Sequence, residues 1–318
     1  MNPDREADEH VLDRVPLRFL VGPTASGKTG LGLRVAQDLG AEIIALDSMT
    51  VYRGLDIGTA KPTAEERALV PHHLVDVADP EGRFDLQAYL GMVEQTLLDL
   101  ESRGSSALFV GGTGLYLAAL LRGVFDGPPS DPDLRAALMA RAEREGDAVL
   151  HEELTAVDPV SAGRIHVNDR RRTVRALEVW RQTGQAMSAH QSQWRAGPCA
   201  REARAVIVGL ELPVEELDRR IRQRTREMLR AGWPEEAARV RSGAGLGPSA
   251  SQALGYEAAA AVASGDLTAE EGLDEIALRT RQFARRQRTW FRKFDIHWMD
   301  PRAESAANAI TARMSSAR

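Results

Sequence analysis

The feature that most constrains the fold is an apolar run, Leu17–Val21, that leads directly into the segment GPTASGKT at residues 22–29. This segment matches the pattern G-x-x-x-x-G-K-[ST], and residues Thr29–Leu39 after it have the spacing of an amphipathic helix. A glycine-rich turn between a buried strand and a helix directs backbone N–H groups towards an anion at the helix N-terminus. The sequence therefore predicts a phosphate-binding loop within an α/β domain.

Strand and helix patterns alternate along the chain after this loop. Glu42–Asp47 and Ala107–Val110 are typical of buried strands, and residues Leu86–Arg103 between them have helical spacing. Further strands are expected at Arg204–Leu212 and near His297–Met299. This alternation predicts an α/β fold, namely a P-loop NTPase-like parallel sheet flanked by helices, with an all-helical insertion.

The insertion follows the segment GPPSDPD, where the strand–helix alternation stops. The length of 318 residues is compatible with about two domains. Residues 131–195 read as almost wholly helical, and Asp131 before Pro132 is a suitable helix start. The predicted organisation is a disordered tail at 1–15, a catalytic core at 16–130 and 196–300, a helical insertion at 131–195 and a tail at 301–318.

Composition excludes several classes of protein. The formal net charge is −5, so the whole chain is no polycation, and the single cysteine, Cys199, excludes a disulfide framework or a CxxC zinc site. No apolar run approaches the ~20 residues that a membrane span needs, and the N-terminus is acidic and polar. We therefore expect a cytoplasmic protein with no membrane partner. Lysine is rare: the chain has only Lys28, Lys61 and Lys293, and the first two lie in the phosphate loop and in the segment 47–62 discussed below.

The phosphate loop assigns chemistry to two side chains. Lys28 is expected to reach the outer phosphate oxygens, and the Thr29 hydroxyl is expected to hold Mg²⁺. The strand Ala107–Val110 continues into glycines with no acidic residue at its end, unlike a common ATPase. Asp47 is the acid expected at a strand tip, either on the Mg²⁺ side as in nucleotide kinases or as a general base. The residues alone leave both interpretations open.

Four further blocks add a specific resemblance. They are DSMTVYRGLDIGTAKP (47–62), PHHLVDVADP (71–80), VGGTGLYLAALLRG (110–123) and RQFARRQRTWFRK (281–293). Together with GPTASGKT, in this order and spacing, they resemble the bacterial tRNA dimethylallyltransferase family over about residues 17–300. A phosphate loop alone would be unspecific, whereas the series of blocks is specific.

The resemblance implies a prenyl transfer. The loop would hold the diphosphate of dimethylallyl diphosphate, and N6 of the tRNA adenosine immediately 3′ of the anticodon (position 37) would attack C1 of the prenyl group. Pyrophosphate would leave with Mg²⁺, and a carboxylate would accept the amine proton, which favours Asp47 as the base. The adenosine is expected to flip out of its stack. The alternatives are a small-molecule or nucleotide kinase that uses ATP, and an RNA-binding regulator with a vestigial loop.

The resemblance also implies roles for individual residues. The catalytic residues would be Asp47, Thr113 and Lys28. The diphosphate would be bound by Gly22, Pro23, Thr24, Ala25, Ser26, Gly27, Lys28, Thr29 and Arg224. The anticodon stem-loop would be bound by Asp47, Ser48, Met49, Thr50, Thr113, Arg135, Arg171, Arg172, Thr173, Val174 and Arg175. Most family members carry glutamine where this chain has Thr50, which weakens any role for this residue. A monomer is expected.

Basic and aromatic residues outside the phosphate loop have competing interpretations. Arginines at 170–175 and 279–292 suit either RNA phosphates or solvated helical faces, and the family places the first group on RNA. His72, His73 and Asp76 are spaced like metal ligands, but a proline-bounded loop favours a structural role. Trp290 and Trp298 are expected to pack at the edge of the sheet.

Overall fold

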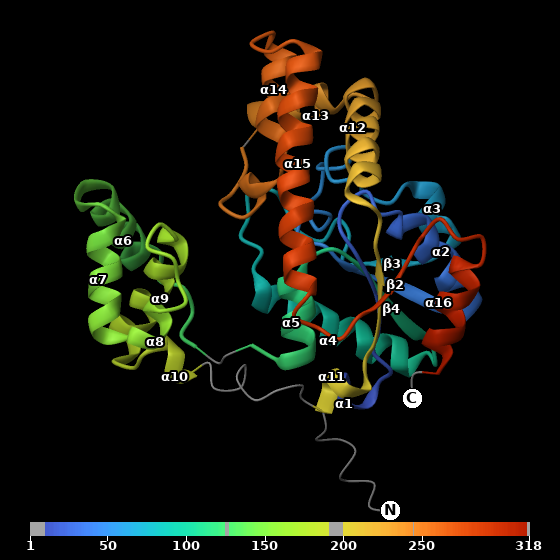
Figure 1. Ribbon diagram of the computed structural model, residues 1–318, viewed down its shortest axis with the longest axis horizontal. Coiled ribbons are helices and arrows are strands. Elements are labelled where there is room, and N and C mark those ends of the chain that lie inside the picture. Colours follow the sequence, from blue (N-terminus) through green and yellow to red (C-terminus); the bar gives the residue numbers. More distant parts are fainter. Residues whose placement is uncertain (1–9, 125–126, 191–199, 244, 317–318) are drawn as a thin grey trace, which may run out of the picture. The chain divides into compact units, whose positions relative to one another are not determined.

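The computed structural model describes residues 10–124, 127–190, 200–243 and 245–316. It contains two compact units, a core made of residues 1–121 and 200–318 and an insertion made of residues 122–199 (Figure 1). The insertion is thus wider than the predicted range 131–195, because the chain already leaves the core at Arg122. Among the helices described, none is long and apolar enough to cross a lipid bilayer.

The core is built on one six-stranded sheet in which every strand pairing is parallel. The strand order is β3-β2-β4-β1-β5-β6. The bounds are β1 Arg18–Val21, β2 Ala41–Leu46, β3 His72–His73, β4 Ser106–Gly111, β5 Val206–Leu210 and β6 His297–Met299. The predicted strands are confirmed within one or two residues of their ends, and the short edge strand β3 forms where a loop was expected.

Alternate residues of the strands face two separate apolar layers. Phe19 and Phe109, from the neighbouring strands β1 and β4, stack with ring centroids 4.8 Å apart in the larger core cluster. Leu20 and Leu108 point into the other cluster. Because side chains alternate between the faces of a sheet, this pattern requires helices on both sides. On one side the cover includes α2 (Lys28–Leu39), and on the other α4 (Leu86–Ser102) and α5 (Gly114–Arg122).

Four helices of the core stand together in a group beyond the strands (Figure 1). They are α12 (Val214–Arg230), α13 (Trp233–Ser242), α14 (Tyr256–Ser264) and α15 (Ala269–Phe291). The longest, α15, is capped at its N-terminus by Thr268, whose hydroxyl forms a capping box with the Glu271 carboxylate. Helix α12 packs along α15, so basic side chains from both helices lie near one another.

The insertion has its own small apolar core. Its helices are α6 (Pro132–Glu145), α7 (Asp147–Val157), α8 (Pro159–Ala162), α9 (Arg170–Thr183) and α10 (Met187–His190). Leu138, Leu154 and Leu177 are almost completely buried between α6, α7 and α9. The helical character predicted for this region is therefore confirmed for the described residues.

The expectation of a C-terminal tail is wrong for most of 301–318. Helix α16 (Ala306–Ser315) buries Ala307, Ile310 and Met314, which follow one another at helical spacing. It packs against α2, and the Arg18 side chain donates from Nε to the Met314 carbonyl over 2.9 Å. Helix α16 is thus an integral layer of the core.

The N-terminal segment also departs from the expected disorder. Residues Val11–Arg14 form helix α1, with Val11 and Leu12 buried in the larger core cluster. Asp13 accepts two hydrogen bonds from Arg201, and this contact lowers the pKa of the Asp13 carboxyl. Residues 1–9 lie outside the described part of the chain.

Replacing Ile310 by alanine tests whether α16 stabilises the core. Ile310 is 0 % exposed, so Ile310→Ala should lower the free energy of unfolding of the core by about 2–4 kcal/mol through lost burial and a cavity. Leu69→Ala is the control, because Leu69 is 62 % exposed on α3 (Ala64–Leu69). Urea unfolding followed by circular dichroism measures both variants. Equal effects of the two substitutions would mean that α16 is not an integral layer.

Candidate active site

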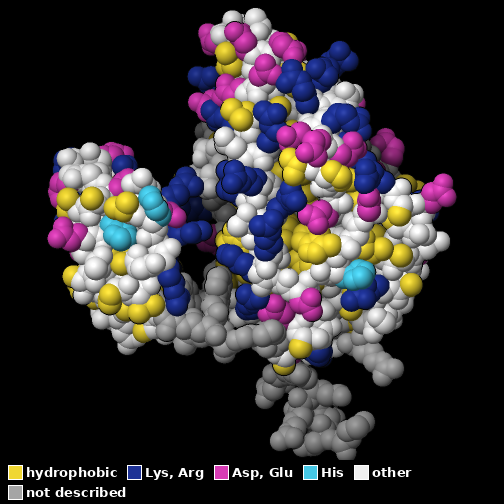
Figure 2. All heavy atoms as spheres, in the orientation of Figure 1, with side chains coloured by type: hydrophobic (Ala, Val, Ile, Leu, Met, Phe, Trp, Pro, Cys, Tyr) yellow, Lys and Arg dark blue, Asp and Glu magenta, His cyan; other side chains and the backbone are white. Residues whose placement is uncertain are grey.

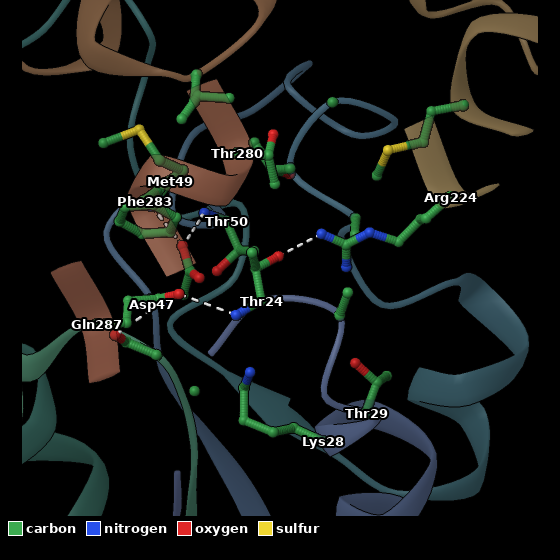
Figure 3. Close-up of a pocket in the computed structure, with 18 of the residues that line it drawn as sticks. Thr24, Lys28, Thr29, Asp47, Met49, Thr50, Arg224, Thr280, Phe283 and Gln287 are labelled. Atoms are coloured by element: carbon green, nitrogen blue, oxygen red, sulfur yellow. Dashed lines mark hydrogen bonds between the residues drawn. The ribbon is translucent and has the colours of Figure 1, made fainter. Parts of the chain in front are cut away.

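A cavity of about 720 Å³ opens at the carboxyl ends of β1, β2 and β4. The loops that line it include the phosphate loop after β1, residues 47–50 after β2 and residues 112–113 after β4. Helices α12 and α15 contribute the remaining polar side chains shown in Figure 3, among them Arg224, Thr280 and Gln287. The strand order therefore collects three distant sequence segments around one space.

The phosphate loop has the backbone shape needed to enclose an anion. Ala25 and Gly27 both have positive φ angles, and α2 begins immediately afterwards at Lys28. Gly22 is required for space, because a Cβ there would lie 2.9 Å from both the Leu210 carbonyl oxygen and the Ser26 hydroxyl. The loop therefore packs closely against the end of β5.

Lys28 projects from the loop into the cavity. Figure 3 shows the side chain pointing into the cavity, and its ammonium donates to the Pro23 carbonyl oxygen over 2.8 Å. The pKa of Lys28 is lowered to about 7, mainly by burial and also by the nearby charge of Arg224, whereas Asp47 opposes the shift. Binding of an anion would raise the pKa of Lys28 and restore its protonated form. The cavity is therefore suited to a negatively charged ligand.

Asp47 stands at the tip of β2 on another wall of the same cavity. Its Oδ1 accepts hydrogen bonds from the backbone N–H groups of Met49, over 2.8 Å, and Thr50, over 3.4 Å. Burial raises the pKa of Asp47, although these N–H groups and the Lys28 charge act in the opposite direction. A raised pKa and a fixed orientation suit a carboxylate that accepts a proton.

Arg224 links α12 to the phosphate loop. Its guanidinium donates to the Thr24 hydroxyl, so the side chain lies over the loop and not on a solvated face. Burial lowers the pKa of Arg224, and Asp47 raises it. Arg219, Arg220 and Arg286 also line the cavity, with Asp47 and Glu227 as its carboxylates, so the lining carries a net positive charge.

Gln287 joins two walls of the cavity and was missed by the sequence reasoning. Its Oε1 accepts from the Thr24 N–H over 2.9 Å, and its Nε2 donates to the Gly112 carbonyl over 2.9 Å. A Cβ at Gly112 would come within 2.2 Å of that Nε2, so a side chain there would displace the Gln287 amide from its position. Gln287 lies in the block 281–293, whose many arginines predict a basic surface but give no sign of the role of this amide.

The loop after β4 is hydrogen-bonded to the residue that precedes Asp47. The N–H groups of Gly112 and Thr113 both donate to the Leu46 carbonyl over 3.1 Å. Thr113 consequently lines the cavity beside Asp47, as expected for a residue at the reaction centre.

Glu236 is a second residue that sequence reasoning missed. Its carboxylate accepts hydrogen bonds from the N–H groups of Asp56, Ile57 and Gly58 and from the Tyr256 hydroxyl. These bonds hold the segment DIGTAKP, part of which lines the cavity. No local pattern signals this role, because Glu236 lies far along the chain on α13.

The structure separates the predicted diphosphate residues into two groups. Gly22, Pro23 and Ser26 do not line the cavity, and the Ser26 hydroxyl is buried beneath the loop without a hydrogen-bond partner. The predicted residues that do line it are Thr24, Ala25, Gly27, Lys28, Thr29, Asp47, Ser48, Met49, Thr50, Thr113 and Arg224. The Thr50 hydroxyl is buried and has no hydrogen-bond partner among the residues that the structure describes.

The predicted RNA contacts in the insertion have unequal surroundings. Thr173 and Val174 are each 1 % exposed and pack inside the insertion, so the expected contact by their side chains is corrected to a packing role. Arg135 and Arg175 both bind Glu178, and Arg172 lies 3.4 Å from Asp169. Arg171 stands with Arg172 in the first turn of α9.

The basic face of α15 is likewise mixed. Arg279 pairs with Glu275 and Arg288 with Glu211, whereas Arg286 lines the cavity and lies 5.8 Å from the Phe283 ring. Figure 2 shows basic side chains gathered over α12 and α15, with acidic side chains between them. Part of this charge is therefore balanced within the protein.

The histidine pair has a structural role. His72 and His73 form β3, the His73 ring contacts Glu42 over 2.7 Å, and Asp76 binds Lys61 and Arg67. Within the residues that the structure describes, no group of three or more His, Cys, Asp or Glu side chains is placed to hold a metal. The structural interpretation is therefore preferred to a metal site.

The donors in the cavity nevertheless fit Mg²⁺. Magnesium keeps several waters and takes one or two protein oxygens together with phosphate oxygens. The Thr29 hydroxyl, in the first turn of α2, lines the cavity with the Lys28 ammonium and the Asp47 carboxylate (Figure 3). A hydroxyl beside an anion-binding loop meets this requirement without an all-protein cage.

The two tryptophans pack as side chains of the core. Trp298, on the edge strand β6, meets Phe291 edge to face at 6.3 Å, which confirms the expected position at the sheet edge. Trp290 packs on Gly114 at the start of α5, and Lys293 lies 3.9 Å from its ring centroid.

The lowered pKa of Lys28 predicts proton uptake when an anion binds. At pH 8 the free site holds Lys28 mostly neutral, because its pKa is about 7, and inorganic pyrophosphate should return it to the ammonium form. At pH 6 Lys28 is already protonated, so this uptake should vanish. Calorimetric titration in buffers of different ionisation enthalpy measures the protons, and Lys28→Met subtracts those of pyrophosphate itself. Equal uptake by both proteins at pH 8 would contradict the prediction.

Comparison with known proteins identifies the family to which this chain belongs. The family model described as IPP transferase matches residues 50–294. The chain is 45 % identical over 278 residues to the tRNA dimethylallyltransferase of Deinococcus radiodurans, covering 86 % of this chain and 89 % of the relative. It is 43 % identical over 288 residues to that of Anaeromyxobacter dehalogenans, covering 90 % and 95 %.

Solved structures agree with these sequence matches. The tRNA isopentenylpyrophosphate transferase of Bacillus halodurans is 34 % identical, with a TM-score of 0.67 over 95 % of this chain and 97 % of that chain. A eukaryotic dimethylallyltransferase acting on tRNA is 25 % identical, with a TM-score of 0.78 over 95 % and 77 %. On the family match and the relatives together, the chain belongs to the IPP transferase family.

Proposed function

We propose that the chain transfers a dimethylallyl group from dimethylallyl diphosphate to N6 of the tRNA adenosine immediately 3′ of the anticodon, at position 37. The observation that carries the proposal is the meeting of Asp47, Lys28 and Arg224 around one cavity beside an anion-binding loop. Membership in the IPP transferase family and relatives named tRNA dimethylallyltransferase support it. The enzyme is proposed to act as a monomer in the cytoplasm.

The cationic wall of the cavity serves the leaving group. As the bond between C1 and the diphosphate oxygen breaks, its electron pair stays on the diphosphate, where charge accumulates. The loop N–H groups, Lys28 and Arg224 are fixed in place before reaction and stabilise that charge. The Thr29 hydroxyl would hold Mg²⁺, which supplies further positive charge to the departing diphosphate.

The opposite wall serves the nucleophile. N6 forms a bond to C1 and loses a proton, which Asp47 accepts; the Met49 and Thr50 N–H groups hold this carboxylate in one orientation. An adenine stacked within its loop cannot reach the cavity, so the base has to flip out of the stack. Ser48 and Thr113 line the cavity near Asp47 and would contact the flipped base.

A kinase remains the alternative from the same fold. The end of β4 argues against it, because Gly111 and Gly112 stand where a common ATPase carries a magnesium-binding acid. Asp47, at the tip of β2, would then have to bind the metal instead of accepting a proton.

The decisive test is incubation with unmodified tRNA, Mg²⁺ and dimethylallyl diphosphate labelled in the prenyl group, with labelled ATP in a parallel reaction. We expect label in tRNA, and nuclease digestion should place it on the adenosine 3′ of the anticodon. A transcript with guanosine at that position is the control and should stay unlabelled. ATP turnover without labelled tRNA would overturn the proposal in favour of a kinase.

Asp47→Asn separates proton acceptance from binding. We expect turnover to fall by about 10²-fold or more, whereas pyrophosphate affinity is nearly unchanged because the amide keeps the size of the carboxylate. Since burial raises the pKa of Asp47, wild-type turnover should decline as the pH falls through that raised value and the carboxylate becomes protonated. The variant should lack this acidic decline. A variant with wild-type turnover would remove Asp47 from the mechanism.

A further inference from the structure

The insertion contains a carboxylate that is completely enclosed by protein. The side chain of Glu178, on α9, is 0 % exposed. Its Oε1 accepts from the Asp131 N–H over 2.7 Å and from the Ser130 hydroxyl over 3.2 Å. Its Oε2 accepts from Arg135 over 2.7 Å and from Arg175 over 2.9 Å. The donors therefore come from Ser130 and Asp131, immediately before α6, and from one arginine each of α6 and α9.

The two arginines are held by this acid but still reach solvent. The side chains of Arg135 and Arg175 are 39 % and 29 % exposed. Arg175 also donates to the Pro128 carbonyl over 2.9 Å, so its guanidinium has a defined orientation. Arg135 lies in the first turn of α6 and Arg175 in the second turn of α9.

Position along α9 connects this cluster to the exposed arginines. Residues separated by three or four positions share a helix face, so Arg175 stands on the side shared with Arg171 and Arg172. Glu178 lies one turn further along α9 and accepts a hydrogen bond from the Arg175 guanidinium. Arg135 and Arg175 therefore share one buried carboxylate, and Arg171 and Arg172 precede Arg175 on the same side of α9.

Stability alone explains such a cluster poorly. Removing charges from water costs free energy that a buried ion pair only partly recovers, and apolar replacements of similar size are often neutral. Burial raises the pKa of Glu178, but hydrogen bonds from Arg175 and Arg135 lower it below the ordinary value, so the carboxylate is ionised at neutral pH. A permanent negative charge beside a surface that binds a polyanion also opposes binding, unless it performs another task.

We propose that Glu178 is a positioning residue for RNA binding, which orients the Arg135 and Arg175 guanidinium groups towards backbone phosphates of the tRNA. This inference rests on the proposed function, in which the insertion binds the anticodon stem-loop. Orientation matters because a guanidinium binds a phosphate through two parallel N–H groups, and a freely rotating side chain loses entropy on binding.

The sign of the effect of Glu178→Gln distinguishes positioning from simple charge. Loss of a negative charge should tighten tRNA binding if Glu178 acts only through its field. Loss of the arginine anchor should instead weaken binding, by about fivefold or more, and make its salt dependence shallower. The Michaelis constant for tRNA should rise, whereas turnover at saturating tRNA and the Michaelis constant for the prenyl donor should stay unchanged.

Glu153→Gln is the matched control in the same unit. Glu153 also bridges two arginines, Arg141 and Arg181, but its side chain is 21 % exposed and its partners lie outside the predicted contact group. We expect this variant to bind tRNA like the wild type. Equal weakening by both substitutions would mean a general loss of structure and would overturn the positioning role.

Arg175→Lys keeps the inference testable if Glu178→Gln does not fold. Lysine retains the positive charge but cannot bridge Glu178 and the Pro128 carbonyl through one planar group. We expect weaker tRNA binding, and wild-type affinity would overturn the proposal. Thermal unfolding of each variant establishes that the folded protein is compared.

The wild-type titration reports the proposed function separately. Absence of tRNA binding by the wild type would overturn both the function and the role of Glu178. Binding by the wild type, with Glu178→Gln equal or tighter, would overturn the positioning role alone. Weaker binding by Glu178→Gln and unchanged binding by Glu153→Gln support it.

Discussion

The electrostatic balance of one cavity governs the chemistry of this protein. Lys28, Arg224 and Asp47 each lose much of their hydration, and the pKa of each shifts towards the neutral form. The negative charge of Asp47 limits the pKa shifts of Lys28 and Arg224, and their positive charges limit the shift of Asp47. The protonation of each group therefore depends on the charges of the others. In the proposed reaction, a diphosphate would stabilise both cations, and the attacking amine would give its proton to the carboxylate. The same enclosure therefore prepares the site for an anionic donor and for a neutral nucleophile.

Elements defined by a continuous local pattern could be predicted from the sequence. Apolar runs ending in glycine or aspartate gave β1, β2 and β4, and the glycine-rich motif gave the loop and its following helix. Helix α16 was missed because, apart from Ile310 and Met314, its apolar residues are alanines, which give only a weak hydrophobic pattern. Its burial depends on the surface of α2, which no local pattern describes.

The candidate site shows the same division between local and distant information. Lys28, Thr29 and Asp47 lie in motifs and were found, whereas Gln287 and Glu236 act through hydrogen bonds to segments far away in sequence. Charge counts were also an incomplete guide. Arg170 appeared as part of a basic cluster, yet it pairs with Asp147, and Thr173 and Val174 point into the insertion.

The two units differ in how their sequences are laid out, and this matters during synthesis. The insertion is one continuous stretch, so all of its described helices can pack as soon as that stretch has left the ribosome. The phosphate loop comes early in the chain, but its strand β1 pairs with β5, and its helix α2 is covered by α16. On its other side β1 pairs with the early strand β4, so the anion cradle is supported on one side until β5 emerges, and α16 then covers α2.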